Sequence, residues 1–341
     1  MKKAVVTGKR QAAIVDAPDP TPKEDWVLVK VHAAPMCTEY KSFTAGETTR
    51  GLGHEAAGEV AAVAGRSHLK PGDRVVVMPQ YPCGQCALCA SGEYIHCENN
   101  FDFAAFTGSG EGWATMAQYL LKPAWLLPRI PDNISYERAS LACCALGPSF
   151  GAFETAGVDA FDTVLITGLG PVGMGAVVNA RFRGARVIAV ESTQERAERA
   201  LTMGAVAVVD PRDPEALKQI QDLSPDGVDC ALDCSGTVAA QRLCIDAARR
   251  KGKVVYVGEC GDELRLRVSP DLIRKGLSIT GSWAYNLHDY PKVMQIIRES
   301  PIVDLMVSHV LPMDRIQEAM EISASGNAAK VILQPWGSHA D

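Results

Sequence analysis

The first third of the chain alternates short apolar runs with turns that contain proline or glycine, such as Lys70-Pro71-Gly72-Asp73. Short runs with this punctuation are typical of β-strands. We expect strands at residues 4–6, 13–15, 26–31, 59–63 and 74–77. Several short strands in succession indicate a small β-barrel.

From Asp162 the pattern changes, and strand-like runs alternate with helix-like segments. We expect strands at residues 163–167, 186–190, 205–209, 228–234, 253–257, 277–280 and 330–333. Helices are expected after the glycine-rich turn at 168–173, from a capping box at Ser192 to Glu195, from Asp213-Pro214, and around Ile316, Ala319 and Met320. This alternation predicts an α/β fold with a parallel, doubly wound sheet.

Length and charge limit the possible functions. A chain of 341 residues exceeds one ordinary core, which predicts two domains. The net charge of −6 and the lack of a basic cluster argue against nucleic acid or an anionic membrane as a partner. Two uncharged runs, 139–153 and 163–180, contain Gly and Pro and are shorter than a membrane span of about 20 residues, so we assign them to buried core. Because no signal-peptide core opens the chain, we expect a cytoplasmic protein.

Four closely spaced cysteines follow the pattern Cys-x2-Cys-x2-Cys-x7-Cys, namely Cys83, Cys86, Cys89 and Cys97. Four such thiolates surround one Zn²⁺ tetrahedrally, and the lack of a catalytic base among them indicates a closed, structural site. The tight spacing and the expected reducing compartment disfavour disulfides. An iron–sulfur cluster is disfavoured because the last gap has seven residues and no proline follows it. A chance grouping of cysteines is the remaining alternative.

A glycine-rich turn, Gly168-Leu169-Gly170-Pro171-Val172-Gly173, follows the strand expected at 163–167. The motif alone is weak evidence in a chain with 30 glycines, but a strand precedes it and a helix follows. In a dinucleotide-binding turn the glycines permit the tight turn, the approach of the pyrophosphate and the packing of helix on strand. The helix N-terminus then receives the phosphates. The residues expected to bind the cofactor are Gly168, Gly170, Pro171, Val172 and Gly173.

Glu191 ends the next expected strand, 18 residues after Gly173. An acid at this place accepts hydrogen bonds from the ribose 2′-OH of NAD and repels the 2′-phosphate of NADP. Ser192 and Thr193 offer no arginine that could bind such a phosphate. The sequence therefore favours NAD over NADP, and the alternative is that Glu191 is an ordinary solvated residue.

Five residues outside the cysteine quartet are candidates for a second, open metal site: Cys37, His54, Glu55, Cys143 and Cys144. Three protein ligands and a vacant position are what zinc needs to polarise a substrate oxygen. Each residue is ambiguous alone, because a lone histidine more often lies in the core and a cysteine pair in an apolar run more often packs there. Composition and spacing leave this site undecided.

Taken together, Cys37, the run Gly53-His54-Glu55-Ala56-Ala57-Gly58, the cysteine quartet, Cys144 and the glycine turn resemble the zinc-containing alcohol dehydrogenases of the medium-chain dehydrogenase/reductase family, over nearly the whole chain. The resemblance implies a Rossmann NAD-binding domain at 146–286 and a GroES-like β-barrel catalytic domain at 1–145 and 287–341. It also implies two zinc ions per chain, NAD as the cofactor, a small alcohol or carbonyl substrate, and assembly as a homodimer or homotetramer.

The resemblance also implies roles for single residues. It implies that Cys37, His54 and a third cysteine bind the catalytic zinc, and that Glu55 approaches or exchanges onto the metal. Cys144 fits the third position better than its neighbour Cys143, because a glycine and an alanine follow it by seven and eight residues. Lys330 stands where the family often has a basic residue near the cofactor phosphates.

Two positions depart from the family pattern. Glu39 stands where a serine or threonine usually begins a proton relay, and Ser42 stands where a histidine is frequent. We hypothesise that Glu39 accepts the alcohol proton, directly or through Thr38 or a water molecule. The alternative is that Glu39 is a surface residue and that zinc and solvent remove the proton.

Several functions remain open at this point. A zinc-free quinone or enoyl reductase of the same superfamily and a non-catalytic, nucleotide-binding structural relative are the alternatives to an alcohol dehydrogenase. A zinc module for nucleic acid is disfavoured by the acidic charge. Secondary alcohols, polyols and amino-alcohols are all candidate substrates. Four aromatic residues could line the pocket or belong to the core: Phe101, Phe103, Trp113 and Trp283.

Overall fold

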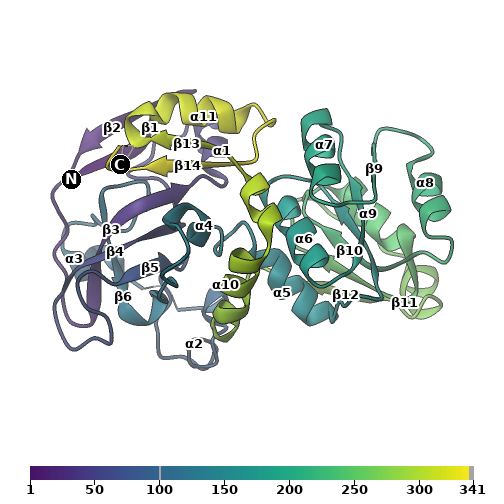
Figure 1. Ribbon diagram of the computed structural model, residues 1–341, viewed down its shortest axis with the longest axis horizontal. Helices are drawn as coiled ribbons and strands as arrows, with labels where there is room; N and C mark the ends of the chain where they lie inside the picture. The colour runs from purple at the N-terminus through teal and green to yellow at the C-terminus, as the bar shows by residue number, and fades with distance from the viewer. Residues whose placement is uncertain (100, 338–341) are drawn as a thin grey trace. The chain divides into compact units, whose positions relative to one another are not determined.

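The computed structural model describes residues 1–99 and 101–337 and separates the chain into two compact units (Figure 1). The first unit comprises Met1–Cys144, Asn286–Glu299 and Val307–Asp341, and the second comprises Ala145–Tyr285 and Ser300–Met306. One segment differs from the expected boundaries, because Ser300–Met306 returns to the second unit. There the side chain of Arg199 donates a hydrogen bond to the carbonyl of Leu305 (2.9 Å).

A six-stranded sheet is the centre of the first unit. Its strands follow the order β13 (Val307–Pro312), β14 (Lys330–Gln334), β3 (Trp26–Pro35), β4 (Ala56–Val63) and β5 (Arg74–Val77), with β6 (Tyr119–Pro123) paired to β3. A separate antiparallel pair consists of β1 (Lys2–Gly8) and β2 (Gln11–Asp16). Among the described residues β13 and β5 end the order, so the pairing of these strands does not close a barrel.

The core of the first unit lies against β3. This strand is central because β4 pairs along one edge, while β6 and β14 share the other edge. Val27, Val29 and Val31 alternate along β3 and are fully buried, as a strand with one face on the core requires. They share a core with the apolar face of α11 (Ile316–Ala324), the helix that the spacing of apolar residues predicted.

Short helices complete the first unit. They are α1 (Glu39–Ala45), α2 (Ala87–Ala90), α3 (Phe103–Thr107), α4 (Tyr136–Ser140), α10 (Tyr290–Glu299) and the single turns η1 (Tyr94–His96), η2 (Ala124–Leu126), η4 (Leu287–Asp289) and η6 (Met313–Arg315). The longest helix in the described part of the chain, α6 (Pro171–Phe182), has 12 residues. A search of these residues finds no helix with the length and apolar character needed to span a membrane.

The second unit contains a six-stranded parallel sheet with helices packed on it (Figure 1). In spatial order the strands are β12 (Ser278–Gly281), β11 (Ala248–Tyr256), β10 (Val228–Asp233), β7 (Thr163–Thr167), β8 (Arg186–Val190) and β9 (Ala207–Val209). The helical segments are α5 (Gly147–Ala156), α6, α7 (Gln194–Thr202), α8 (Ala216–Leu223), α9 (Val238–Ala247), η3 (Val268–Ile273) and η5 (Pro301–Met306). The expected doubly wound sheet is confirmed.

The strand order of this sheet reverses at β7. The chain runs from β7 outwards to β8 and β9, and then returns to β10 on the other side of β7. Ligands of doubly wound sheets bind at the carboxyl ends of the strands where such a reversal occurs. The glycine-rich turn at 168–173 begins directly after β7, so the topology places it at this point.

Two helices of the second unit begin later than the sequence predicted. The capping box at Ser192 is wrong: Thr193 is the N-cap of α7 and no side chain caps it. The Glu191 carboxylate already accepts hydrogen bonds from the amides of both residues (2.8 and 2.9 Å). The helix expected from Asp213-Pro214 begins at Ala216, because the Asp213 side chain forms a turn with the backbone that follows it.

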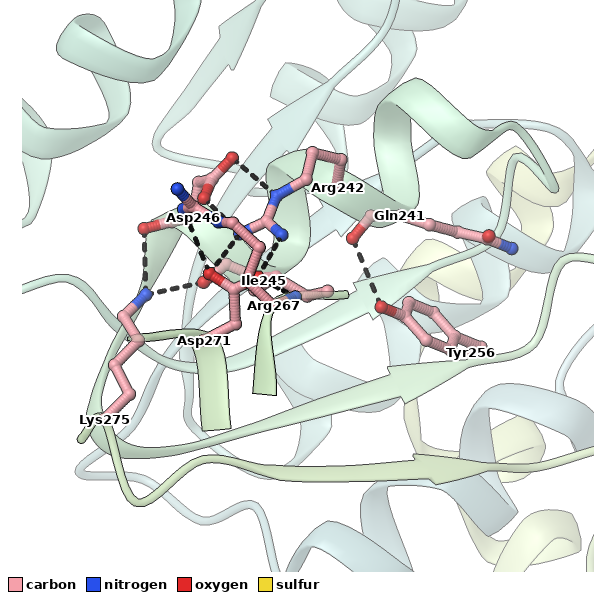
Figure 2. Close-up of polar contacts among 8 residues, drawn as sticks. All are labelled: Gln241, Arg242, Ile245, Asp246, Tyr256, Arg267, Asp271 and Lys275. Carbon is pink, nitrogen blue, oxygen red and sulfur yellow. Dashed lines mark hydrogen bonds and ion pairs between the residues drawn. The ribbon is translucent and has the colours of Figure 1, made fainter. Parts of the chain in front are cut away.

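A network of ion pairs holds η3 against α9 (Figure 2). Arg242 on α9 bonds to Asp246 one turn later and to Asp271 in η3 (2.7 Å). The amide of Arg267 donates a second hydrogen bond to Asp271 (2.8 Å), and the carboxylate is only 4% exposed. Lys275 donates hydrogen bonds to the last carbonyls of α9. This network is the main polar connection between the irregular segment after β11 and the helix.

Removing the central charge of this network tests its contribution to stability. The Arg242 guanidinium and the Arg267 amide hold the pKa of Asp271 well below its usual range. A depressed pKa contributes stability that is present above the unfolded pKa of about 3.9 and is lost as the pH falls through the folded value. We expect Asp271→Asn to lower the thermal midpoint by about 2–4 °C at pH 7. The difference from wild type narrows between pH 5 and pH 3.

Differential scanning fluorimetry across this pH range measures the effect. Asp222→Asn is the matched control, since Asp222 forms an exposed pair with Lys218 one turn away on α8. Such exposed pairs contribute little, so the control keeps the wild-type midpoint. A midpoint of the Asp271 variant equal to that of wild type at pH 7 contradicts the role of the network.

Candidate active site and metal centres

The cysteine quartet forms a compact tetrahedron of sulfur atoms in the first unit. The sulfur separations are 4.0 Å for Cys83–Cys89, 3.5 Å for Cys86–Cys89, 3.8 Å for Cys86–Cys97 and 3.6 Å for Cys83–Cys97. Zinc–sulfur bonds of about 2.3 Å in a tetrahedron require roughly 3.8 Å between sulfurs. A disulfide requires about 2.05 Å. The four side chains therefore fit one zinc ion, and none of the eleven cysteines forms a disulfide.

The backbone favours the thiolate of Cys83, whereas burial raises the pKa of Cys89 to about 12. Hydrogen bonds from the amides of Gln85 and Cys86 lower the pKa of Cys83 to about 6. The loop is also held from outside the quartet, because the Asn286 side chain donates hydrogen bonds to the carbonyl of Ser91 (2.9 Å) and the carboxylate of Glu93 (2.7 Å). The sequence contained no signal for this contact, since its partners are about 195 residues apart.

The second candidate cluster lies where three strands meet. Cys37 follows the end of β3, and the pair His54-Glu55 precedes β4. These two places are neighbours because β3 and β4 are antiparallel, with Ala33 opposite Ala57. Lys330 opens β14, whose yellow arrow lies beside the purple β3 in Figure 1, and the Met36 amide donates to the Val331 carbonyl (2.8 Å).

Four side chains of this region bring donor atoms together: Cys37, His54, Glu55 and Cys144. These atoms all lie within 4.8 Å of one another, and the Cys144 sulfur is 3.3 Å from His54 Nε2. Thiolate, imidazole and carboxylate are the ligands that zinc prefers. The neighbouring Cys143 is outside the cluster, since its buried thiol donates to the carbonyl of Val77. Cys144 reaches the site from the turn between α4 and α5.

The charges of this cluster call for a cation. Burial would lower the pKa of His54, but hydrogen bonds with Cys37 and Glu39 raise it to about 11. A hydrogen bond from Cys144 lowers the pKa of Cys37 well below that of a free thiol. The shifts of both pKa values show that this group of acidic neighbours favours a positive charge at the site. A zinc ion supplies the same positive charge, and the donor set fits it.

Glu39, which we expected to accept the alcohol proton, has two partners within the first unit. Its Oε1 lies 3.1 Å from His54 Nδ1, and its Oε2 accepts a hydrogen bond from the Cys37 amide (2.6 Å). The residue is only 9% exposed. Burial would raise the pKa of Glu39, but the hydrogen bond from His54 lowers it. Both carboxylate oxygens therefore have a partner within the protein, and the hypothesis that Glu39 accepts the alcohol proton stays a prediction.

Lys330, which we expected near the cofactor phosphates, has a partner within the first unit. It is fully buried in the first unit, and its Nζ is 2.7 Å from Glu55 Oε1. The other oxygen of Glu55 accepts a hydrogen bond from the Cys144 amide (3.1 Å). Burial raises the pKa of Glu55 to about 7, although the charge of Lys330 opposes this shift. The ammonium of Lys330 is therefore paired within the first unit, and its expected place near the cofactor phosphates stays a prediction.

The glycine turn of the second unit has the geometry of a phosphate-binding turn. Gly168 has φ +79°, and a Cβ atom on it would lie 2.7 Å from Ser235. A Cβ atom on Gly173 would lie 1.9 Å from the Gly168 carbonyl, so helix α6 packs directly on the turn. Gly170 is the N-cap of α6, and a Cβ atom there would meet nothing within 4 Å. The backbone beside Gly170 is therefore open to a ligand.

Glu191 lies next to this turn at the end of β8. Its Oε2 accepts a hydrogen bond from the Leu169 amide (2.8 Å), and it is 9% exposed. Sequence reasoning overlooked Arg196 on α7, whose Nη1 is 3.9 Å from the Glu191 carboxylate. It also overlooked the loop after β10, where Ser235 contacts the turn. The sequence did offer a signal for Arg196, namely an arginine in the first turn of the helix that follows Glu191.

The four candidate aromatic residues divide between core and surface. Phe101 and Phe103 pack against Trp26, with ring centroids 4.9 and 5.7 Å apart. They belong to an aromatic cluster of the first unit, which supports the core interpretation. The carbonyl of Trp113 accepts a hydrogen bond from the hydroxyl of Tyr81 (3.0 Å) near this cluster. Trp283, in the second unit, is 47% exposed.

Comparison with known proteins gives consistent matches. Residues 171–299 match the family described as zinc-binding dehydrogenase, and residues 23–132 match the alcohol dehydrogenase GroES-like domain. An uncharacterised zinc-type alcohol dehydrogenase-like protein of Escherichia coli (strain K12) is 32% identical over 98% of both chains. Sorbitol dehydrogenase of Bacillus subtilis (strain 168) is 32% identical, over 98% of this chain and 97% of its own. The structure of alcohol dehydrogenase TADH from Thermus sp. ATN1 has a TM-score of 0.89 and 26% identity, over 98% and 99% of the two chains.

Metal analysis tests the two clusters. We expect about two zinc ions per chain by mass spectrometry, one for each donor set. Cys86→Ser and Cys144→Ser each lower the count to about one, because each removes a ligand from a different cluster. Cys260→Ser is the control, since Cys260 lies outside both donor sets. The second zinc site is contradicted if wild type binds one zinc ion per chain and Cys144→Ser still binds one.

A substitution in the glycine turn tests the cofactor site. Gly170 has φ −64°, so alanine fits the backbone, and the added methyl group has no protein neighbour. We expect Gly170→Ala to keep the wild-type thermal midpoint while weakening NADH binding roughly tenfold or more, measured by fluorescence titration. Gly261→Ala, also in an open position of the second unit, is the control. Unchanged NADH affinity in the Gly170 variant places the cofactor elsewhere.

Proposed function

Because the chain belongs to the zinc-type alcohol dehydrogenases of the medium-chain dehydrogenase/reductase family, we propose that it transfers hydride between NAD and a secondary alcohol, a polyol or an amino-alcohol. The donor set of Cys37, His54 and Cys144 is the observation that carries this proposal. The relative named sorbitol dehydrogenase supports a polyol among the candidate substrates.

The catalytic metal site has three protein donors from the first unit. Cys37, His54 and Cys144 supply two sulfurs and one nitrogen, which leaves a position for the substrate oxygen. When bound, zinc acts as a Lewis acid and makes the alcohol proton easier to remove. Glu55 would be available as a fourth donor, since its carboxylate lies in the same cluster. In the arrangement described here, Glu55 is held beside the metal position by Lys330 and the Cys144 amide.

The remaining zinc has no catalytic role in this proposal. The four sulfurs of the quartet fill a tetrahedron and leave no position for a substrate. This zinc holds together a loop whose regular structure is limited to α2 and η1. This zinc would stabilise the folded first unit, because a structural zinc site exists only when the surrounding segment is folded, so the free energy of zinc binding favours folding.

NAD binds to the second unit at the point where the strand order reverses. The amides at the start of α6 receive the pyrophosphate, and the open backbone at Gly170 allows its approach. Glu191 lies at the end of β8 in the place of a ribose-binding acid, and its charge disfavours a 2′-phosphate. Arg196 acts in the opposite direction, because an arginine near this place attracts such a phosphate. We favour NAD because Glu191 contacts the turn directly, through the hydrogen bond from the Leu169 amide.

Two alternatives were open from the sequence alone. A zinc-free quinone or enoyl reductase is set aside, because the chain has two complete zinc-donor sets and its relatives are of the zinc type. A non-catalytic nucleotide-binding relative differs from the enzyme in a measurable way, because it oxidises no alcohol.

The free state of all eleven cysteines is consistent with a reducing compartment such as the cytoplasm. The homodimer or homotetramer stays a prediction, which light scattering after gel filtration tests.

A screen of alcohols tests the proposed function directly. We expect the protein with two zinc ions to reduce NAD with at least one secondary alcohol, polyol or amino-alcohol, seen as absorbance of NADH. NADP gives a lower kcat/KM, because Glu191 repels its 2′-phosphate. Cys144→Ser abolishes turnover, while Cys260→Ser keeps it. The proposal fails if the protein binds zinc and NADH but oxidises no secondary alcohol, polyol or amino-alcohol. In that case the protein is the non-catalytic relative.

A further inference from the structure

We propose that Glu39 is a positioning residue that orients two zinc ligands, His54 and Cys37, at the same time. This inference rests on the proposed function, because it assigns Glu39 a role toward the catalytic zinc. It is an alternative to the proton-relay hypothesis, and the experiment below separates the two. Glu39 touches neither substrate nor metal in this proposal and acts through its two neighbours.

The two carboxylate oxygens have one partner each. Oε1 is 3.1 Å from Nδ1 of His54, and Oε2 is 2.6 Å from the amide nitrogen of Cys37. The side chain reaches back from the first residue of α1 to the peptide two residues earlier. A single buried carboxylate thus connects a ligand that follows β3 with a ligand that precedes β4.

The bond to His54 determines which ring nitrogen can bind a metal. A carboxylate only accepts hydrogen bonds, so the proton of the neutral ring lies on Nδ1. The other nitrogen, Nε2, then presents its lone pair toward Cys144, whose sulfur is 3.3 Å away. Carboxylates that fix the tautomer and orientation of a zinc-bound histidine typically change metal affinity by about 10- to 100-fold.

The bond to Cys37 restricts a second ligand. The Cys37 amide belongs to the short connection between β3 and α1, which has no regular secondary structure of its own. Its hydrogen bond to Glu39 holds this peptide, and with it the direction of the Cys37 side chain. The same connection is held on its other side by the Met36 amide, which donates to Val331 in β14.

Glutamine at position 39 separates the two bonds. An amide has one oxygen acceptor and one NH₂ donor, so Glu39→Gln can accept from His54 or from the Cys37 amide but not from both. The donor that is left without an acceptor, either His54 Nδ1–H or the Cys37 amide, then faces the NH₂ group of the glutamine and loses its hydrogen bond. Aspartate keeps two acceptor oxygens but is one methylene shorter, so Glu39→Asp restores part of the function. Glu47→Gln is the matched control, because Glu47 is an exposed acid just after α1 that bonds only to Ser42.

The experiment measures zinc release from the intact protein to a chromogenic chelator. Wild type releases two zinc ions per chain in two phases. We expect Glu39→Gln to release one of them about 10- to 100-fold faster, with Glu39→Asp between the two and Glu47→Gln equal to wild type. The phase of the cysteine quartet is unchanged, which shows that the variant is folded. With Co²⁺ in place of zinc, the visible absorption bands of the catalytic site shift in the Gln variant.

Two results overturn the inference. Unchanged zinc release and an unchanged Co²⁺ spectrum in Glu39→Gln show that the carboxylate does not position the ligands. The second result is an alcohol oxidation rate that no longer depends on pH in Glu39→Gln. This result identifies Glu39 as the proton acceptor. Neither result affects the proposed function, which fails separately if wild type turns over no alcohol in the screen.

Discussion

An excess of negative charge in one buried pocket is the constraint on which the first unit depends. Two thiols and two carboxylates converge there on one histidine, and Lys330 is the paired cation. Such a group is stable only with a further positive charge, because burial penalises unpaired charges. The strand arrangement creates this situation: the ends of β3, β4 and β14 meet, and each delivers one or two of the side chains. A metal bound there would therefore contribute to the packing of this sheet as well as to its chemistry.

Close approach of backbone to backbone plays the corresponding role in the second unit. At Gly168 and Gly173 a side chain would overlap the neighbouring loop or carbonyl, so the turn, α6 and the segment after β10 can only pack with glycine at both positions. At Gly170 no protein atom occupies the space. Gly168 and Gly173 are therefore required for packing, whereas Gly170 leaves space for a ligand. This division explains why a motif that is common by chance becomes informative when a parallel strand leads into it and a helix leaves it.

Three charged residues illustrate what local sequence cannot decide. Glu39, Glu191 and Lys330 were each expected to meet a ligand, and each also has a bonding partner within its own unit that the local sequence did not indicate. A carboxylate can accept from any donor within reach, and backbone amides nearby compete with a substrate or a ribose. Which donor is in reach depends on the path of the chain 2 to 22 residues away, and for Lys330 on a residue 275 positions from it. Residue type indicates the chemistry of a side chain, but not its partner.

The sequence by itself determined the succession of strands and helices, the parallel sheet, the cysteine quartet and the glycine turn, because these follow from local periodicity and from spacings within about 20 residues. It also contained the ligands of the second cluster, but only as isolated residues in three distant segments. Tertiary structure alone decided that Glu39 bonds to His54, that Lys330 is buried against Glu55, and that Ser300–Met306 belongs to the second unit. These outcomes depend on strand pairing between segments far apart in the chain, and no local pattern records such pairing.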